Sequence, residues 1–290
     1  MISLTQSIYS FMRFVGIQSW IRWGLRYRFF CILPSTNHEF TVPFFGTSYS
    51  GNMNNFIDRS VFFYGAHERE AMLYMASRIP KDGIVLDVGA NVGHHSLFFS
   101  TKAREVHAFE PNPRFRMQFE RFMNDNNVKN VHLHQVGLGD STSTIHYYAP
   151  TGDNQGIGSF VAEHNDSNMD IGTLPVVRGD DIVKSLGLER VDFIKIDVER
   201  YEESVLIGLQ ETLRKFKPIV VLEYAEADFK SRDTFLSLIQ GYVPYVLKVN
   251  TPKFFFFNIP IGAPVPFDFS HSHAEMLLEP EPIVKCTPVL

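Results

Sequence analysis

Short apolar runs separated by amphipathic segments dominate the middle of the chain. The runs at residues 84–88, 105–109, 131–135, 192–197 and 218–223 have the length and composition of buried strands. Several of the segments between them repeat apolar residues at helical spacing. Strands that alternate with helices favour a parallel sheet with right-handed crossovers. The pattern therefore predicts an α/β fold.

Further elements extend this alternation toward both ends of the chain. Helices are expected at about residues 67–77, 113–124, 201–214 and 233–240. Further strands are expected at residues 40–45, 61–64, 174–177, 242–249 and 254–258, with a Ser/Gly/Asn-rich turn at 48–55 and a polar hairpin-like insert at 141–173. The last two strands are too close in sequence for a crossover connection, so they should pair antiparallel. The expected sheet is mostly parallel with an antiparallel terminal strand.

The chain divides into three parts by its pattern. Residues 81–260 carry most of the α/β alternation, residues 1–80 form an N-terminal extension of helix and short strands, and residues 261–290 form a Pro-rich tail. The first 35 residues interleave aromatic side chains with four arginines and contain no acid. Such a segment can lie on an anionic membrane, or it can pack its aromatic face on the α/β domain. We expect packing, because aromatic stripes at helical spacing usually belong to a core.

Composition argues against several classes of protein. A net charge of −5 gives no general attraction to nucleic acid. The two cysteines, Cys31 and Cys286, are too few for a disulfide framework or a zinc cluster, which indicates a reducing compartment. No apolar run reaches the ~18 residues that a membrane span needs, and the N-terminus lacks the zones of a secretory signal. We expect a cytosolic protein.

The stretch from Ile84 to His95, IVLDVGANVGHH, carries the strongest chemical signal. An apolar strand runs into Asp87, and then Gly89 and Gly93 bracket a tight turn before a helical pattern. Glycines let a ligand approach the backbone closely, and a helix start offers free N–H groups. The turn lacks the third glycine of a dinucleotide fingerprint, and the Asp87 carboxylate would repel a pyrophosphate. The turn therefore favours a ligand that carries an amine or a sulfonium.

A second acid follows 23 positions after Asp87. Glu110 comes directly after the apolar run at residues 105–109 and before Pro111. An acid at the tip of the second strand, about 20 positions on, is placed to accept hydrogen bonds from both ribose hydroxyls. The turn and the spaced acid together predict an adenosine-containing ligand.

With these two motifs the sequence resembles the FkbM family of S-adenosylmethionine-dependent methyltransferases. The similarity rests on blocks that begin at Tyr64 (YGAHE), Leu86 (LDVGANVG), Phe109 (FEPNP), Gly137 (GLGD), Phe193 (FIKIDVE) and Leu222 (LEY) and span about residues 40–260. The resemblance implies a Rossmann-like class I methyltransferase sheet with S-adenosylmethionine as cofactor. The family commonly has glycine after the Asp-Val-Glu block, where this chain has Arg200, a change expected to narrow or charge the acceptor pocket.

The resemblance also implies which residues contact the cofactor. These are Glu68, Asp87, Gly89, Asn91, Gly93, Glu110 and Asp140. The turn from Asp87 to Gly93 would cradle the methionine part and Glu110 would hold the ribose. Asp140 would face the adenine amine, although a turn-capping role explains it equally well. Glu68 would touch the methionine amino group, although an acid in a first helical turn is favourable without any ligand.

Lys195, Asp197 and Glu199 form the next chemical signal. Period-two alternation places the three side chains on one side of an extended segment. A cation and two carboxylates at the end of a central strand are costly to bury without purpose, so we interpret them as catalytic rather than structural. A hydroxyl acceptor loses its proton as it attacks the methyl group, which a carboxylate can accept. His94 and His95 are the next candidate bases.

The motifs together predict an S-adenosylmethionine-dependent methyltransferase. By resemblance to the family, the acceptor is a hydroxyl of a sugar, a glycan or a secondary metabolite. N-methylation of a small molecule stays open, and so does a cofactor-binding subunit without turnover, although the Lys195–Asp197–Glu199 face argues against the latter. No metal is expected, because His132, His134 and His146 lack ligand spacing and the pair His271/His273 lies in a Pro-rich tail.

Overall fold

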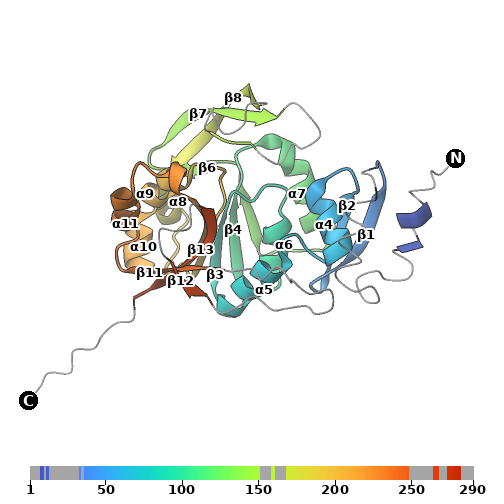
Figure 1. Ribbon diagram of the computed structural model, residues 1–290, viewed down its shortest axis with the longest axis horizontal. Helices are drawn as coiled ribbons and strands as arrows, with labels where there is room; N and C mark the ends of the chain where they lie inside the picture. The colour runs from blue at the N-terminus through green and yellow to red at the C-terminus, as the bar shows by residue number, and fades with distance from the viewer. Residues whose placement is uncertain are drawn as a thin grey trace, which may run out of the picture.

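The structure is a computed structural model of the 290-residue chain. It describes residues 7–9, 11–12, 33, 36–150, 158–160, 168–247, 264–267 and 273–281. Figure 1 shows a central sheet with helices on both sides and a small additional sheet at the top.

The central sheet has the strand order β12-β11-β13-β10-β9-β3-β4-β5. Its parallel part consists of β3 (Ile84–Val88), β4 (Glu105–Phe109), β5 (Val131–His134), β9 (Phe193–Ile196) and β10 (Ile219–Ala225). All five parallel strands correspond to apolar runs in the sequence. This part confirms the predicted mostly parallel α/β sheet.

The antiparallel end of the sheet is built differently from the prediction. Strand β13 (His273–Pro280) lies between β10 and β11 (Tyr242–Val246) and pairs antiparallel with both, while β12 (Val265–Pro266) pairs antiparallel with β11. An antiparallel terminal strand is therefore present, but residues 273–280 belong to the sheet and not to a separate tail. The strand expected at residues 254–258 lies outside the described residues.

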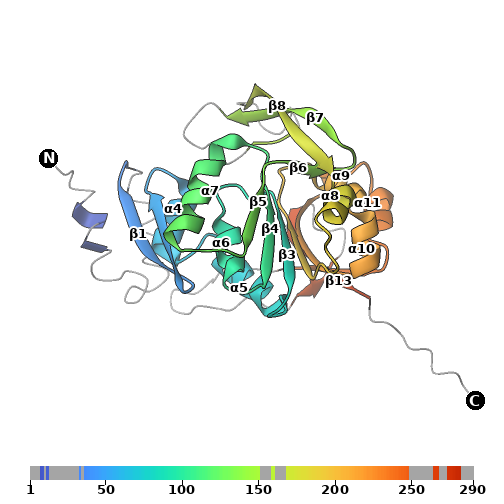
Figure 2. The same ribbon diagram turned by 180° about the vertical axis from the view of Figure 1, so that it is seen from behind.

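Helices cover both faces of this sheet (Figures 1 and 2). Helices α5 (Arg69–Arg78), α6 (His94–Ser100) and α7 (Pro113–Asp125) pack on one face. The other face carries α8 (Gly179–Ser185), α9 (Glu202–Gly208), α10 (Gln210–Phe216) and α11 (Arg232–Leu238). The helix expected at residues 201–214 is thus two short helices, and α8 was not predicted.

Alternation along the buried strands fills a core on each side. Val85 belongs to the cluster with α6 and α7, whereas its neighbour Leu86 belongs to the cluster with α9 and α10. Both side chains are fully buried, and burial of each contributes roughly 1.5–3 kcal/mol. A parallel sheet covered on both faces explains why these strands are apolar at consecutive positions.

The N-terminal extension contains a hairpin and a helix. Strands β1 (Glu39–Phe44) and β2 (Thr47–Asn52) pair antiparallel, and α4 (Phe56–Tyr64) follows. The strand predicted at residues 61–64 is wrong because these residues form the last turn of α4. The turn predicted at residues 48–55 is also wrong over most of its length, because β2 occupies it.

The described part of the N-terminal arm packs on this extension. Tyr9 is fully buried, and its ring lies 5.8 Å from that of Phe62 and 6.2 Å from that of Phe63, with edge-on geometry. Most of the first 35 residues, including both tryptophans, lie outside the described residues. Within the part of the chain that the structure describes, no helix has the length and apolar character to cross a membrane.

The polar insert forms a three-stranded sheet of its own. Strands β6 (Gly137–Gly139), β8 (Asn168–Arg178) and β7 (Ser143–Pro150) lie in this order, and β7 and β8 form the predicted hairpin. Residues 174–177, expected as a separate strand, are the end of β8. The insert lies at the top of the molecule in Figure 1, above the central strands.

Candidate active site

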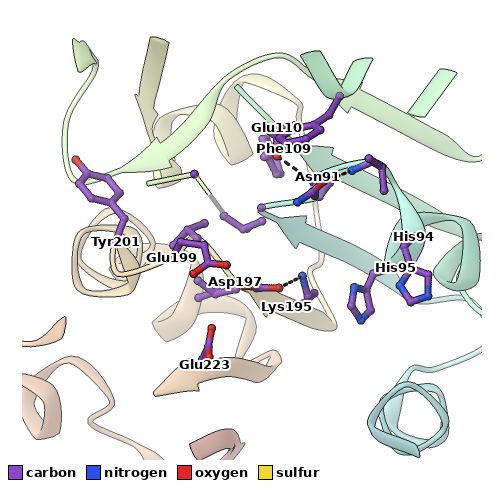
Figure 3. A pocket seen from close by; sticks show the side chains of 18 of the residues that line it. Asn91, His94, His95, Phe109, Glu110, Lys195, Asp197, Glu199, Tyr201 and Glu223 are labelled. Carbon is purple, nitrogen blue, oxygen red and sulfur yellow. Dashed lines mark hydrogen bonds and ion pairs between the residues drawn. The ribbon is translucent and has the colours of Figure 1, made fainter. Parts of the chain in front are cut away.

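A cavity of about 560 Å³ opens at the carboxyl ends of the parallel strands. Its walls come from the segments that follow β3, β4 and β9, from the end of β10, and from α4, α5, β13 and the insert. Ligands of open α/β sheets bind in this position. Figure 3 shows side chains that line the cavity and labels ten of them.

The glycine turn after β3 forms one wall of the cavity. Gly89 has φ +83°, and its amide donates a 3.0 Å hydrogen bond to the Phe109 carbonyl. A Cβ at Gly89 would lie 1.8 Å from the carbonyl oxygen of Asp197, so no other residue fits here without backbone movement. Asn91, with φ +49°, also lines the cavity. Gly93 begins α6 at φ +88° and packs against Phe119, and it is not a lining residue.

Glu110 fixes the shape of this turn from the end of β4. Its carboxylate accepts hydrogen bonds from the backbone amides of Asn91 (2.9 Å) and Asn112 (2.8 Å). Burial raises the pKa of Glu110 to about 7 despite these bonds. The carboxylate lines the cavity and has further lone pairs for two hydroxyl donors. The structure thus places Glu110 at the end of β4 in the cavity wall, and its role toward a ribose stays a prediction.

Asp87 lies beneath the cavity and not in its wall. It is fully buried, accepts a 2.6 Å hydrogen bond from the Ser96 hydroxyl, and lies 3.8 Å from the Lys195 ammonium group. Burial raises the pKa of Asp87, and the charge of Lys195 opposes this shift. Asp87 therefore ties the glycine turn to α6 and β9 from below.

Lys195 and Asp197 come together at the end of β9. The Lys195 ammonium group donates a 3.0 Å hydrogen bond to the Asp197 carboxylate. Burial would lower the pKa of Lys195, but the Asp197 and Asp87 carboxylates outweigh burial and raise it. Lys195 therefore keeps its proton and holds Asp197 at the cavity wall, where Figure 3 shows the pair.

Glu199 reaches the cavity by a turn. Strand β9 ends at Ile196, and Glu199 (φ +53°) and Arg200 (φ +75°) are both left-handed, so the extended segment predicted through Glu199 is wrong. Burial, followed by the Asp197 and Glu223 carboxylates, raises the pKa of Glu199 to about 8. Arg200 does not line the cavity, and its guanidinium pairs with Asp228 at 2.9 Å. The expected effect of Arg200 on the acceptor pocket is therefore not observed.

Of two further residues predicted to contact the cofactor, one lines the cavity and the other does not. Glu68 precedes α5 with φ +53° and lines the cavity, and its carboxylate lies 3.8 Å from the His95 imidazole. Asp140 is exposed, accepts a hydrogen bond from the Ser141 hydroxyl at 3.0 Å, and is not among the lining residues. The structure thus brings Glu68 to the site but not Asp140.

His94 and His95 also line the cavity. Both residues are buried, and in the described structure neither Nε2 atom has a hydrogen-bond partner. Burial, together with nearby positive groups, lowers the pKa of both imidazoles well below the usual value, so they are neutral. Their Nε2 atoms are buried polar atoms whose hydrogen-bonding capacity is unused in the described structure.

The cavity also contains residues outside the predicted catalytic and cofactor-binding sets. An aromatic wall is formed by Phe160, whose ring lies 5.2 Å from that of Tyr147 and 5.1 Å from that of Tyr201. Glu223 and Glu275 also line the cavity. Glu223 follows an apolar run and was recognisable as a strand-end acid, whereas no local signal marks Glu275.

Comparison with known proteins identifies the family. The model of the methyltransferase FkbM domain matches residues 87–244, which is more than half of the chain. The chain is 30% identical over 173 residues to the hexuronic acid methyltransferase AglP of Haloferax volcanii, covering 59% of this chain and 68% of AglP. It is 27% identical over 179 residues to the 2-O-methyltransferase NoeI of Sinorhizobium fredii, covering 56% of this chain and 72% of NoeI.

A third relative is much longer. The chain is 27% identical over 213 residues to the AMB antimetabolite synthetase AmbE of Pseudomonas aeruginosa, and the match covers 61% of this chain and 10% of AmbE. The family match includes the glycine turn, Glu110 and the segment from Lys195 to Glu199. The chain therefore belongs to the FkbM family of S-adenosylmethionine-dependent methyltransferases.

Proposed function

We propose that this enzyme methylates a hydroxyl group of a sugar or a related small molecule. The observation that carries the proposal is the pair of carboxylates, Asp197 and Glu199, at the cavity wall directly beside the Gly89 turn. The names of two relatives, a hexuronic acid methyltransferase and a 2-O-methyltransferase, support a sugar acceptor.

The residues present fit S-adenosylmethionine. The turn at Gly89 lines the cavity with backbone atoms and no side chain, and Glu110 provides a buried carboxylate for the ribose hydroxyls. Asn91 continues this wall, while Asp87 and Gly93 support it from behind. Glu68 is placed to accept a hydrogen bond from an amino group. When bound, the cofactor supplies an electrophilic methyl group on a sulfonium.

The acceptor hydroxyl would lie next to Asp197 and Glu199. A bound cofactor would supply the methyl group to this oxygen, and its sulfur would keep the electron pair of the carbon–sulfur bond. The hydroxyl proton passes to a carboxylate, for which Glu199 is suited because its pKa of about 8 lies near the working pH. Lys195 keeps its proton and holds Asp197, so we assign it a positioning role instead of a proton-transfer role.

Amide variants test this assignment. Asp197→Asn and Glu199→Gln should each retain S-adenosylhomocysteine affinity in calorimetry while turnover falls about a hundred- to ten-thousand-fold. With the native enzyme, turnover should rise with pH up to about 8 as Glu199 loses its proton, and Glu199→Gln should remove this dependence. The exposed Glu189→Gln, outside the cavity, is the control.

Two results would contradict the assignment. If both amide variants turn over at the native rate with the true acceptor, the carboxylates are not catalytic and His95 becomes the next candidate. If a chelator abolishes turnover and a divalent ion restores it, a metal lowers the pKa of the hydroxyl in place of direct base catalysis.

A further inference from the structure

The aromatic wall of the cavity, formed by Phe160, Tyr147 and Tyr201, has no part in the methyl transfer described above. The Phe160 ring lies at its centre and contacts the other two rings. All three side chains line the cavity, and Figure 3 shows Tyr201 at the edge of the site, beyond Glu199. Aromatic rings grouped beside a cavity offer apolar faces against which another flat ring can stack.

Contacts of the polar insert hold this wall in place. The backbone amides of Tyr148 and Ser159 each donate a hydrogen bond to the carbonyl of the other residue, at 2.8 and 2.9 Å. The Ser159 hydroxyl also donates a hydrogen bond to the Glu199 carbonyl, which connects the wall to the turn after β9. The pairing of β7 with β8 shifts its register at Tyr147, and such bulges redirect side chains beside active sites. The backbone of the insert therefore positions Tyr147 and Phe160 at the cavity.

The wall lies over the segment that follows β5. The Glu110 amide donates a 3.0 Å hydrogen bond to the His134 carbonyl, so the ends of β4 and β5 lie side by side. Gly137 follows His134 closely and lies against the Phe160 ring, because a Cβ at Gly137 would be 3.1 Å from that ring. Burial raises the pKa of the Tyr147 hydroxyl, and the nearby Glu110 carboxylate adds to this rise. The wall thus faces the part of the cavity beside the proposed ribose acid.

The order of the strands gives the direction in which a bound adenosine extends. Strands β9, β3, β4 and β5 are successive neighbours in the sheet. Asp197 follows β9, the Gly89 turn follows β3, and Glu110 follows β4. In S-adenosylmethionine the sulfonium, the ribose and the adenine follow one another in this order. With the sulfonium near Asp197 and the ribose at Glu110, the adenine would extend toward the end of β5.

The side chains at this end suit a flat base. Leu138, which follows Gly137, and Pro111, which follows Glu110, line the cavity together with the aromatic wall. Asp140, which the family resemblance implies as the partner of the adenine amine, is exposed and does not line the cavity. Stacking on aromatic side chains can hold a base without a hydrogen bond to its edge.

We propose that Phe160, flanked by Tyr147 and Tyr201, forms the adenine subsite, and that the base stacks on this wall. Stacking on Phe160 takes the place of the contact to Asp140. This inference rests on the ribose role proposed for Glu110, and it does not depend on which acceptor is methylated.

Calorimetry with S-adenosylhomocysteine and with 5′-methylthioadenosine tests the subsite. Both ligands contain adenosine, but only the first contains the amino-acid part. Phe160→Ala should weaken both ligands by the same factor, about tenfold or more, whereas Phe160→Tyr keeps the ring and should keep native affinity. Tyr148→Ala is the matched control, because Tyr148 is the neighbouring aromatic residue on β7 and does not line the cavity.

A second variant separates stacking from folding. Phe160→Leu keeps an apolar side chain of similar size but removes the ring, so it should also weaken both ligands. Urea unfolding shows whether each variant is folded. Native affinity of the folded Phe160→Leu variant for both ligands would overturn the proposal.

Other outcomes would assign the wall a different role. Weaker binding of S-adenosylhomocysteine alone would place Phe160 at the amino-acid part and overturn the adenine subsite. A raised KM for the acceptor with native affinity for both ligands would mean that the wall holds the acceptor. If Asp140→Ala weakens both ligands and Phe160→Ala does not, the base is held at Asp140.

The subsite and the proposed function can fail separately, because the calorimetry uses no acceptor. Native binding by the Phe160 variants refutes the subsite and leaves sugar O-methylation intact. If no sugar is methylated, the proposed function is wrong, and weaker binding of both ligands by Phe160→Ala still supports the subsite. Native affinity of Glu110→Ala together with weaker binding by Phe160→Ala would refute only the ribose role of Glu110.

Discussion

Gly89→Ala should cause one of the largest effects of any single methyl group added to this protein. Gly89 has φ +83°, and the added Cβ would meet the backbone carbonyl oxygen of Asp197 at 1.8 Å. The left-handed conformation costs an alanine roughly 1–2 kcal/mol. The contact adds about 1–3 kcal/mol, because a backbone atom cannot rotate away and the two strands must separate. We expect the free energy of unfolding to fall by about 2–5 kcal/mol.

Gly46→Ala is the matched control. Gly46 has φ +92° in the exposed β1–β2 turn, and an added Cβ there meets nothing within 4 Å. The free energy of unfolding of Gly46→Ala should therefore fall only by the cost of the left-handed conformation, about 1–2 kcal/mol. Urea unfolding measures both losses, and calorimetry should show weaker S-adenosylhomocysteine binding for Gly89→Ala alone. Equal losses of stability and native affinity in both variants would refute the close approach of the β3 turn to Asp197.

Three further predictions follow from the geometry. Glu110→Ala should weaken S-adenosylhomocysteine binding about tenfold or more, because it removes the carboxyl group that we propose as the ribose acceptor and that accepts a hydrogen bond from the Asn91 amide. Native affinity in calorimetry would refute this role. Burial raises the pKa of Glu202 to about 8, so its stabilising contribution is complete below the unfolded pKa of about 4.5 and is lost as pH rises to about 8. The Glu202 carboxyl group should lower the free energy of unfolding by at most about 1.4 kcal/mol per pH unit across this range. Urea unfolding at several pH values measures this decrease. Glu202→Gln should make the free energy of unfolding depend less on pH, whereas the control Glu189→Gln should not. Arg200→Val should lower the free energy of unfolding by about 1–2 kcal/mol more than Arg200→Gly does, because a β-branched residue tolerates φ +75° poorly. Equal urea unfolding midpoints of the two variants would contradict this.

The parts of the fold that depend on local chemistry could be predicted from the sequence. The β3 strand, the Gly89 turn and the acid at the end of β4 are each specified by a few consecutive residues, and the structure has them as expected. Buried parallel strands are apolar at consecutive positions and short, which made their number and order along the chain recognisable.

Helix α4 shows where a local pattern is ambiguous. The run Val61-Phe-Phe-Tyr has strand-like composition, yet it forms the last turn of a helix. Asn55 caps that helix by accepting a hydrogen bond from the Asp58 amide, and Gly65 ends it at φ +91°. These two capping signals favour a helix, but the aromatic run outweighed them in the prediction. Burial of Phe62 and Phe63 against the core stabilises either structure, so composition alone does not decide.

Part of the cavity wall depends on contacts between distant segments. Glu275 comes opposite Glu223 only because β13 inserts between β10 and β11, and such a register follows from tertiary packing. The aromatic wall likewise requires Phe160 from the insert to meet Tyr201 from the segment before α9. No local sequence pattern specifies either contact, so the role of these residues in the cavity could be recognised only in the folded structure.

The turn after β9 holds two residues in strained left-handed conformations, and neighbouring contacts compensate for this strain. Glu199 and Arg200 are consecutive left-handed residues, each costing roughly 1–2 kcal/mol relative to an extended conformation. The Ser159 hydroxyl donates a hydrogen bond to the Glu199 carbonyl, and Arg200 pairs with Asp228, so contacts on both sides of the turn compensate. An extended continuation would direct Glu199 along the strand, whereas the turn brings its carboxylate to the cavity near Asp197 and Glu223. The strain is thus located where it places the Glu199 carboxylate in the cavity wall.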